Sequence, residues 1–477
     1  MNNTFACLIP APQRICVDEK NSLKISDINS FFAENIFNEF ADDIRELFAD
    51  FSLKSEAAAD SENAQFTLRL NSALPPEAFS IVVTTQGITL SASDRAGIIY
   101  ALSACRQMFF AAMICGPLNA RLDCGKVEDF PRFAFRSFHL DSARHFQNTA
   151  VIKRMLKLMS QFRLNYFHWH LVDSQGWRLQ LKTTAGLENK YTSTPGFYTA
   201  ANIKEIIDFA AKLNISIIPE VDFPGHSLGT LQYFPQYACI NAEKPREFCL
   251  GNPESKMFIK NVLREIMDLF PASQYIHIGG DEAASTNWDK CPLCQAALKA
   301  ENCSNIRELE NKFMCDIARF VIDSGRQPII WGTCSGQTYQ AQTTIQAWLD
   351  IREPLRVAPN GNKVIYSVHT SLYFDYPANL SEPWETWMFE LSERGVYMTD
   401  PFIIWPDKVK DVIIGTEACL WTETVPQWRV IPKLLPRLYA YSECAWSMPE
   451  RKDYQDFCRR KELLEAAGYM DYLISAK

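Results

Sequence analysis

Eight short apolar segments recur between residues 136 and 418, and longer amphipathic segments separate several of them. Apolar runs that alternate with helices are typical of parallel strands buried on both faces. The candidate strands are residues 136–141, 164–173, 215–222, 275–282, 327–332, 344–349, 363–367 and 411–418. Eight such units over about 320 residues fit a (β/α)8 barrel better than an open sheet.

Four segments between these strands have apolar residues three and four positions apart, which predicts amphipathic helices. They are residues 149–163, 201–214, 255–270 and 305–325. Helices in these positions supply the crossovers that parallel neighbouring strands require.

The first 130 residues have a different pattern. The segments "FTLRL" (66–70) and "FSIVVTT" (79–85) are typical of strands. Residues 94–113 predict an amphipathic helix with Asp94 as its N-cap. Strands followed by a helix predict a small α+β domain.

The sequence therefore predicts an α/β protein of two domains, with a boundary near "DFPRF" (129–133). Residues 1–130 are expected to form an α+β N-terminal domain, and residues 131–477 a (β/α)8 TIM barrel.

Composition excludes several classes of partner. The net charge is −8 and no long basic run is present, which disfavours nucleic acid. No window offers about 18 uncharged apolar residues, so no membrane span is expected. The N-terminal segment lacks the basic start and continuous apolar stretch of a signal peptide. With 15 scattered cysteines, these features predict a cytoplasmic protein with reduced thiols.

One cysteine pair has the spacing of zinc ligands. Cys291 and Cys294 stand in "CPLC", and zinc ribbons complete their four ligands with a second pair. Neither a second CxxC nor an HxxxH pair lies nearby in the sequence. A structural metal is therefore not expected here, and no cofactor is predicted.

Acidic, histidine and aromatic side chains gather where the candidate strands end, which is where the active site of a barrel lies. They are Asp141, Arg144, His145, His168, His170, Asp173, Glu220, Asp222, His226, Asp281, Glu282, Trp331, Trp348, His369, Tyr373, Asp375, Glu417, Trp421 and Glu423. Any one of them has an ordinary structural explanation, such as a helix cap or a core side chain. Their recurrence at the same end of several strands indicates a site.

The composition of this set indicates carbohydrate chemistry. No glycine-rich phosphate loop is present, and carboxylic acids serve the general-acid step of glycoside cleavage. A metal-dependent hydrolase is the competing interpretation, with His168, His170, Asp173 and His226 as ligands. The two histidines of "HWH" share one face of a strand, where packing inside the barrel is equally expected.

Six blocks, in this order, resemble the family 20 glycoside hydrolases, which are β-N-acetylhexosaminidases. The blocks are "DFPRFAFRSFHLDSARHF", "LNYFHWHLVDSQGWRL", "IIPEVDFPGH", "HIGGDE", "YFDYP" and "ACLWTE". The resemblance covers roughly residues 70–450. It implies an α+β domain followed by a catalytic barrel, in agreement with the strand and helix pattern.

The resemblance implies a retaining exo-enzyme that releases terminal β-linked GlcNAc or GalNAc through an oxazolinium intermediate. Glu282 is then the general acid/base, and Asp281 orients the 2-acetamido group, whose oxygen is the nucleophile. Tyr373 matches the tyrosine that hydrogen-bonds this oxygen.

The remaining matches surround the terminal sugar or support the acid. The hydroxyl-binding positions are Arg144, Asp375 and Glu423, the aromatic walls are Trp331, Trp348 and Trp421, and the polar supports are Asp173, His226 and Asp222, with His277 as a further candidate. Two positions depart from the family: Glu417 replaces a frequent glutamine, and Ser174 replaces a frequent acid.

The adjacency of Asp281 and Glu282 favours this mechanism. Ordinary retaining glycosidases need two carboxylates about 5–5.5 Å apart across the scissile bond, whereas adjacent strand residues project to opposite faces. The pair is sensible if one carboxylate moves the proton while the substrate supplies the nucleophile. The neighbouring anion is also expected to raise the pKa of Glu282, and the two preceding glycines permit the bend.

Two alternatives stay open at this point: a sugar-binding paralogue without catalysis, and the metal-dependent barrel hydrolase. The intact Asp281–Glu282 pair, with Tyr373 and Arg144, argues against the first. The predicted partner is a carbohydrate with a terminal N-acetylhexosamine, without nucleic acid or membrane. The sequence specifies neither the natural glycan nor the oligomeric state.

Overall fold

The computed structural model describes residues 4–114, 116–190, 194–240, 242–332, 339–379, 381–402, 405–435 and 437–475. The chain forms two compact units. One consists of Met1–Ala134, Arg154–Leu164 and Leu438–Lys477, and the other of Phe135–Lys153 and Asn165–Arg437. The division predicted at residues 130 and 131 stays a prediction.

The second unit is built on a closed barrel of eight parallel strands, as predicted. Each predicted strand overlaps one observed strand. The strands are β8 (Phe135–Asp141), β9 (Tyr166–His170), β12 (Ser216–Phe223), β13 (Tyr275–Gly279), β14 (Gln327–Trp331), β15 (Thr344–Ala347), β16 (Val364–Tyr366) and β17 (Ile413–Leu420). A short hairpin of β10 (Val172–Asp173) and β11 (Gly176–Trp177) follows β9.

The barrel interior changes from apolar to polar along the strands. Four core residues packed together, Phe135, Ile218, Ile329 and Ile365, come from β8, β12, β14 and β16. Such alternate-strand layers are typical of these barrels. Side chains two positions further on point to the same side, and at these positions stand Ser137, Glu220, Trp331 and Ser367, all buried. The polar layer lies toward the carboxyl ends, where the site is expected.

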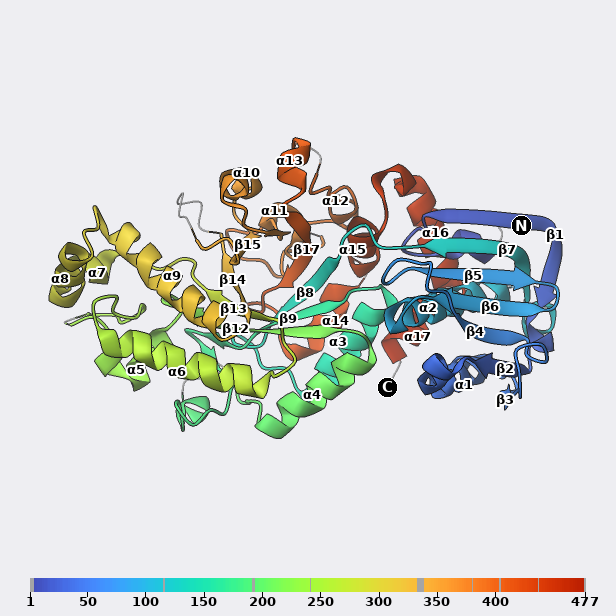
Figure 1. The fold of residues 1–477 in the computed structure, drawn as a ribbon, viewed down its shortest axis with the longest axis horizontal. Helices are drawn as coiled ribbons and strands as arrows, with labels where there is room; N and C mark the ends of the chain where they lie inside the picture. The colour runs from blue at the N-terminus through green and yellow to red at the C-terminus, as the bar shows by residue number, and fades with distance from the viewer. Residues whose placement is uncertain are drawn as a thin grey trace. The chain divides into compact units, whose positions relative to one another are not determined.

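Amphipathic helices cover the outside of the barrel, and the four predicted ones are confirmed to within two residues at each end. Figure 1 shows α4, α6 and α9 running along one side of the strands. The helices of this part of the chain are α3 (Thr149–Gln161), α4 (Ala200–Lys212), α5 (Leu228–Tyr233), α6 (Pro253–Leu269), α7 (Thr286–Lys290), α8 (Pro292–Ala300), α9 (Ile306–Asp323), α10 (Glu353–Val357), α11 (His369–Leu372), α12 (Glu393–Tyr397), α13 (Asp407–Lys410) and α14 (Val430–Leu434).

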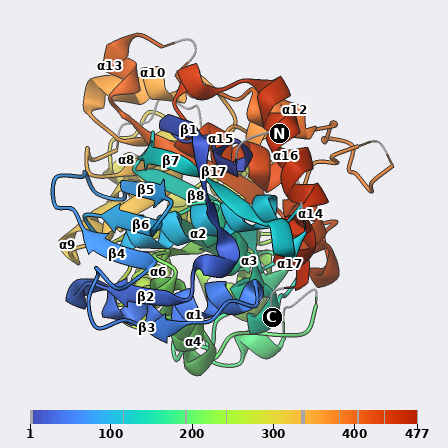
Figure 2. The same cartoon turned by 90° about the vertical axis from the view of Figure 1, so that its right-hand side faces the viewer.

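The first unit contains a seven-stranded mixed sheet in the order β1-β7-β5-β6-β4-β2-β3, and Figure 2 shows these strands one above another. The predicted strands are β4 (Phe66–Leu70) and β5 (Phe79–Thr84). The others are β1 (Arg14–Lys24), β2 (Ser30–Ala33), β3 (Glu56–Ala57), β6 (Gly87–Ala92) and β7 (Arg121–Asp129). The helices of this unit are α1 (Ala41–Asp50), α2 (Arg95–Met113), α15 (Arg437–Trp446), α16 (Tyr454–Ala466) and α17 (Tyr469–Ser475).

Helix α2 is the central helix of the first unit. Its predicted N-cap is confirmed, because the Asp94 carboxylate accepts a hydrogen bond from the Gly97 backbone at 2.8 Å. The helix has the length and mean hydropathy of a membrane span, but 89% of that window is buried. Its contacts with β5, β6 and β7 explain the apolar composition as core packing.

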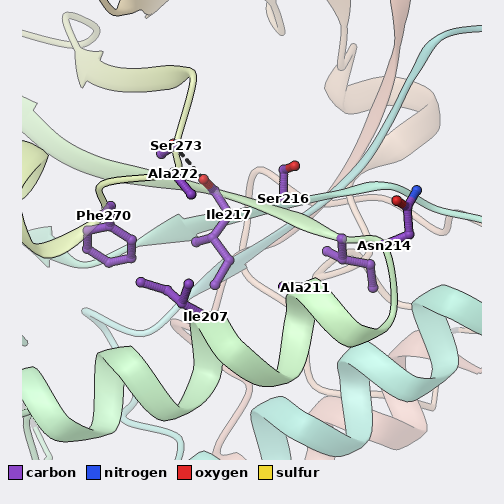
Figure 3. Close-up of a pocket in the computed structure, with 9 residues that line it drawn as sticks. Ile207, Ala211, Asn214, Ser216, Ile217, Phe270, Ala272 and Ser273 are labelled. Carbon is purple, nitrogen blue, oxygen red and sulfur yellow. Dashed lines mark hydrogen bonds between the residues drawn. The ribbon is translucent and has the colours of Figure 1, made fainter. Parts of the chain in front are cut away.

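A cavity of about 240 Å³ lies beside the amino-terminal end of β12 and the segment that precedes β13. Figure 3 shows Ile207 of α4, Ile217 of β12 and Phe270 around it. Ser273 closes one side by donating a hydrogen bond to the Ile217 carbonyl at 2.7 Å. In barrels of this class the active site lies at the opposite end, where the strands have their carboxyl termini.

Candidate active site

The Asp281–Glu282 pair follows the end of β13, in a backbone turn that few residues other than glycine adopt. The strand ends at Gly279, not at residue 282 as predicted. Gly279, Gly280 and Glu282 have φ angles of +67°, +102° and +49°. The two carboxylates therefore point apart because of this left-handed turn, and not, as predicted, because successive side chains of a strand point to opposite faces. Asp281 is buried, whereas the Glu282 side chain is 60% exposed.

Gly279 is required by close packing as well as by its backbone angle. A Cβ atom here would lie 1.8 Å from Asp222 Oδ1 and 2.7 Å from Asp222 Cα. The same Asp222 oxygen accepts a hydrogen bond from the Gly280 backbone at 3.2 Å. The glycines thus bring the turn directly against β12.

Gly279→Ala should lower the free energy of unfolding by about 2–5 kcal/mol, the sum of left-handed strain and overpacking. The matched control is Gly361→Ala, where φ is +81° but no heavy atom lies within 4 Å of the added Cβ. That variant should lose only the strain, about 1–2 kcal/mol. Chemical denaturation measures both, and equal losses would contradict the packing argument.

His226 joins the two carboxylates to the rest of the site. It follows β12 and has a φ of +49°, a strained conformation of the kind found at functional sites. Its Nε2 lies 3.5 Å from Glu282 Oε2 and 4.0 Å from Asp281 Oδ2. Its Nδ1 lies 3.1 Å from Asp173 Oδ2. The imidazole therefore connects Glu282 to a buried anion.

Asp173 is the centre of this charged network. Besides His226, its Oδ2 lies 2.8 Å from Arg144 Nη2 and 3.1 Å from His170 Nε2. Arg144 in turn lies 3.8 Å from Glu423 Oε1, and its guanidinium is 5.0 Å from the centre of the Trp421 ring. Asp173 is 2% exposed, so its place is behind the site, as a support for Arg144 and His226.

Tyr373, Asp375, Trp421 and Glu423 come together on the β16 and β17 side of the barrel. The Tyr373 and Trp421 rings are 6.2 Å apart, and Tyr373 forms a backbone bridge with Cys419 of β17. Arg437 fixes this segment by donating a hydrogen bond to the Tyr376 carbonyl at 2.9 Å.

Several buried polar atoms near this group have no hydrogen-bond partner among the described residues. They are Asp281 Oδ1, Asp375 Oδ1, Glu423 Oε2 and Trp348 Nε1. Burial, followed by the charge of Glu423, raises the pKa of Asp375 well above its usual range. Buried polar groups in proteins normally have partners, so these atoms are suited to a polar ligand. Trp348 itself is half-buried just after β15.

Trp331 is placed differently from the other predicted aromatic residues. It is 1% exposed and donates a hydrogen bond to Glu220 Oε1 at 2.7 Å. Its ring lies 5.8 Å from that of Trp421. The structure puts Trp331 inside the barrel beside Trp421, and its contact with a substrate stays a prediction.

The histidines proposed as metal ligands form ion pairs in the barrel interior. His170 Nδ1 lies 2.5 Å from Glu220 Oε2, and Nε2 faces Asp173. Burial opposes the charge of His170, but Glu220 and Asp173 raise its pKa well above the usual value. Both ring nitrogens of His170 thus face carboxylates of the chain itself.

His168 belongs to the same network. It contacts Glu417, the position at which the family resemblance predicts a glutamine. Its Nδ1 lies 2.8 Å from Glu417 Oε1, and its Nε2 lies 3.1 Å from Glu220. Burial alone lowers the pKa of His168, but these carboxylates raise it to about 9. His277 also faces Glu220, at 3.0 Å. Glu417 therefore belongs to the polar network of the barrel interior.

The pKa values of the adjacent carboxyl groups differ in the direction opposite to that predicted. The hydrogen bond from His226 lowers the pKa of Glu282. Burial, with the charge of Glu282, raises the pKa of Asp281 to about 6. The prediction that the adjacent anion raises the pKa of Glu282 is therefore wrong for the free protein. Glu282 is exposed and lies 3.5 Å from His226 Nε2, whereas Asp281 is buried and lies 4.0 Å from the same atom.

Asp141 is a structural part of the site to which sequence reasoning gave no role. Its Oδ1 accepts hydrogen bonds from the backbones of Ala143 and Arg144, at 2.8 and 3.0 Å. Its Oδ2 accepts one from the Thr422 backbone at 3.1 Å. It thereby ties the Arg144 turn to the Trp421–Glu423 turn. A strand-end aspartate followed by a turn is the only sequence signal for this position.

The chain matches known proteins over nearly its whole length. Residues 133–449 match "Glycosyl hydrolase family 20, catalytic domain", and residues 6–130 match "Glycosyl hydrolase family 20, domain 2". A β-hexosaminidase of Akkermansia muciniphila is 29% identical over 81% of this chain and 83% of that protein. One of Porphyromonas gingivalis is 28% identical over 95% of this chain, which spans 62% of that relative's length.

A solved structure has the same fold. The exo-β-N-acetylglucosaminidase of Vibrio harveyi, in complex with N-acetylglucosamine, superposes with a TM-score of 0.87 and 26% identity. The match covers 98% of this chain and 78% of that one. With the catalytic-domain match extending over more than half of the residues, the chain belongs to glycosyl hydrolase family 20.

Proposed function

We propose that this chain is a retaining exo-β-N-acetylhexosaminidase, which releases terminal β-linked N-acetylglucosamine or N-acetylgalactosamine from glycans by substrate-assisted catalysis. The relatives named β-hexosaminidase and the N-acetylglucosamine complex of the Vibrio harveyi enzyme support this proposal. The observation that carries it is the divergence of two adjacent carboxylates, one buried and one exposed, which both face Nε2 of His226.

In the first step, the acetamido oxygen of the substrate attacks C1 as the glycosidic bond breaks. Glu282 gives its proton to the leaving oxygen, because it is the carboxyl group that reaches into solvent. The product of this step is an oxazolinium ion with its positive charge on the former amide. The buried Asp281, whose Oδ1 has no partner among the residues that the structure describes, accepts a hydrogen bond from the amide N–H and stabilises that charge.

In the second step, Glu282 removes a proton from water, which attacks C1 and opens the ring. Two displacements at C1 give retention of the β configuration. The Tyr373 hydroxyl donates a hydrogen bond to the acetamido oxygen, and burial raises the pKa of Tyr373 well above its usual value, so the hydroxyl keeps its proton.

Arg144, Asp375 and Glu423 bind hydroxyl groups of the terminal sugar. Their charged groups converge beside the Trp421 ring, whose apolar face suits the C–H face of a pyranose. Asp173 and His226 act behind them by fixing Arg144 and Glu282.

Hydrolysis of aryl N-acetyl-β-glucosaminide and its galacto-isomer tests the function. We expect turnover of at least one, with the β-anomer appearing first in proton NMR, and no comparable turnover of the β-glucoside, which lacks the acetamido group. Binding of N-acetylglucosamine without turnover would favour the inactive paralogue. Equal cleavage of the glucoside would exclude substrate assistance.

The dependence of kcat/KM on pH should be bell-shaped, because the reactive state holds one proton on Glu282 and none on Asp281. Above about pH 6, where Asp281 is ionised, both groups lose their protons and no acid remains. Below the lowered pKa of Glu282, both are protonated, and Asp281 cannot stabilise a cation. Because kcat/KM reports the free enzyme, initial rates at low substrate concentration give both limbs. A rate that keeps rising through neutral pH would contradict this assignment.

A further inference from the structure

Four buried cysteines converge on one point in the barrel unit, apart from the catalytic residues. They are Cys239, Cys249, Cys291 and Cys294, and all four sulfur atoms lie within 4.8 Å of one another. The Sγ–Sγ distances are 3.7 Å for Cys239–Cys294, 3.7 Å for Cys249–Cys291 and 3.6 Å for Cys249–Cys294. The thirteen cysteines that the structure describes form no disulfide.

The second pair of ligands that "CPLC" lacked in the sequence is supplied by the fold. Cys239 and Cys249 belong to the loop between α5 and α6, more than forty residues before Cys291. They stand ten positions apart, so they match neither CxxC nor any other compact ligand motif. The expectation that no partners complete the set was wrong for this reason.

The spacing of the sulfur atoms is that of a tetrahedral metal site. Four sulfur atoms about 2.3 Å from a central zinc ion are about 3.8 Å from one another. The observed 3.6–3.7 Å distances agree with this geometry. They are far longer than a disulfide bond of about 2.05 Å.

The backbone around the cluster also fits anionic sulfur ligands. Cys291 is the N-cap of α8 and Cys294 lies in its first turn, where a helix favours negative charge. Gly251 packs directly on this turn, because a Cβ there would lie 2.1 Å from the Leu293 carbonyl oxygen. In the loop that contains Cys239 and Cys249, the Cys249 backbone N–H donates a hydrogen bond to the Tyr237 carbonyl at 2.9 Å.

We propose that Cys239, Cys249, Cys291 and Cys294 bind one Zn²⁺ as a structural site. Each thiol loses its proton on binding, so four protons are released and four Zn–S bonds form. An all-thiolate tetrahedral set selects zinc or iron. Four protein ligands leave no open position for a substrate or water, which makes the site structural rather than catalytic.

The site would link the segment after β12, which contains His226, to the segment after β13, which contains Asp281 and Glu282. The loop with Cys239 and Cys249 is bonded to the His226 loop, through Phe248 N to Pro224 O at 3.0 Å and Ser227 N to Arg246 O at 3.1 Å. It is bonded to the segment after Glu282 as well, because Trp288 Nε1 donates to the Phe248 carbonyl at 2.9 Å. Cys291 and Cys294 follow that segment directly.

Elemental analysis of the untagged, dialysed full-length protein by inductively coupled plasma mass spectrometry tests the proposal. We expect about one zinc per chain in the parent and in Cys303→Ser, a matched control at a nearby buried cysteine outside the cluster. Cys294→Ser and Cys249→Ser should each lose at least tenfold in zinc content. Metal-free parent protein, or zinc retained in both cluster variants, would overturn the proposal, and iron in place of zinc would overturn the choice of metal.

A second measurement covers variants that fail to fold. Mercurial titration of thiols in the folded parent protein should release zinc, which a chromogenic chelator detects, and the release should be complete when the cluster thiols have reacted. Protein refolded with Co²⁺ should show the visible d–d bands and the sulfur-to-cobalt charge transfer of a tetrahedral thiolate site. Disulfides joining these cysteines in the native protein, found by peptide mapping, would overturn the proposal.

Discussion

Glu282→Gln should reduce kcat for an N-acetyl-β-glucosaminide with a sugar leaving group by about 10²–10⁴-fold, the range typical of a lost general acid. The amide has the shape of the carboxyl group but no proton to give to the leaving oxygen. The Glu282 side chain is 60% exposed, so the substitution creates no buried polar group and the fold should be preserved. Steady-state kinetics and circular dichroism measure the two effects.

A comparison of substrates with different leaving groups distinguishes the loss of the general acid from a distortion of the site. An aryl glycoside with an acidic phenol needs little protonation, so Glu282→Gln should impair it much less than the sugar glycoside. Glu301→Gln, an exposed position of the same unit, should behave as the parent. Equal losses on both substrates would indicate a positional defect and contradict the role of Glu282 as proton donor.

The barrel was predictable because its strands are buried on both faces and read as apolar runs. The strands of the first unit gave a weaker signal. In β1 only Leu23 is buried, and the other side chains are exposed or half-exposed. In β7 the alternation of buried and exposed positions is interrupted between Cys124 and Val127, and the last buried residue, Asp129, is polar. Their pairing is set by the neighbouring strands, which lie far away in the sequence, and no local pattern contains that information.

The position of the predicted site residues near the carboxyl ends of the barrel strands could also be predicted, but the ionisation of Asp281 and Glu282 could not. Asp281 and Glu282 were found at the end of a strand, where a barrel site is expected. Which of them holds the proton depends on His226, which comes from the preceding strand and reaches Glu282 at 3.5 Å. The position of Trp331 inside the barrel and the gathering of four cysteines depend on tertiary contacts in the same way.

Asp281→Asn should reduce kcat by about 10²–10³-fold, as expected for the loss of one fixed electrostatic contact to a developing charge. Asparagine has the same size, but its neutral amide cannot balance the positive charge of the oxazolinium ion. KM should change much less than kcat, because the charge exists only after the acetamido oxygen has attacked C1. Asp289 is exposed and lies ten residues after Gly279. Asp289→Asn is therefore the matched control and should retain parental kinetics.

The pH profile of Asp281→Asn distinguishes electrostatic stabilisation from a packing role. In the parent, the descending limb of kcat/KM lies near pH 6, because Asp281 keeps the pair protonated up to about that value. Without Asp281, the remaining carboxyl group is Glu282, whose pKa His226 lowers. The descending limb should therefore move to lower pH, and a variant that is slower but keeps the parental profile would show that Asp281 only fills space.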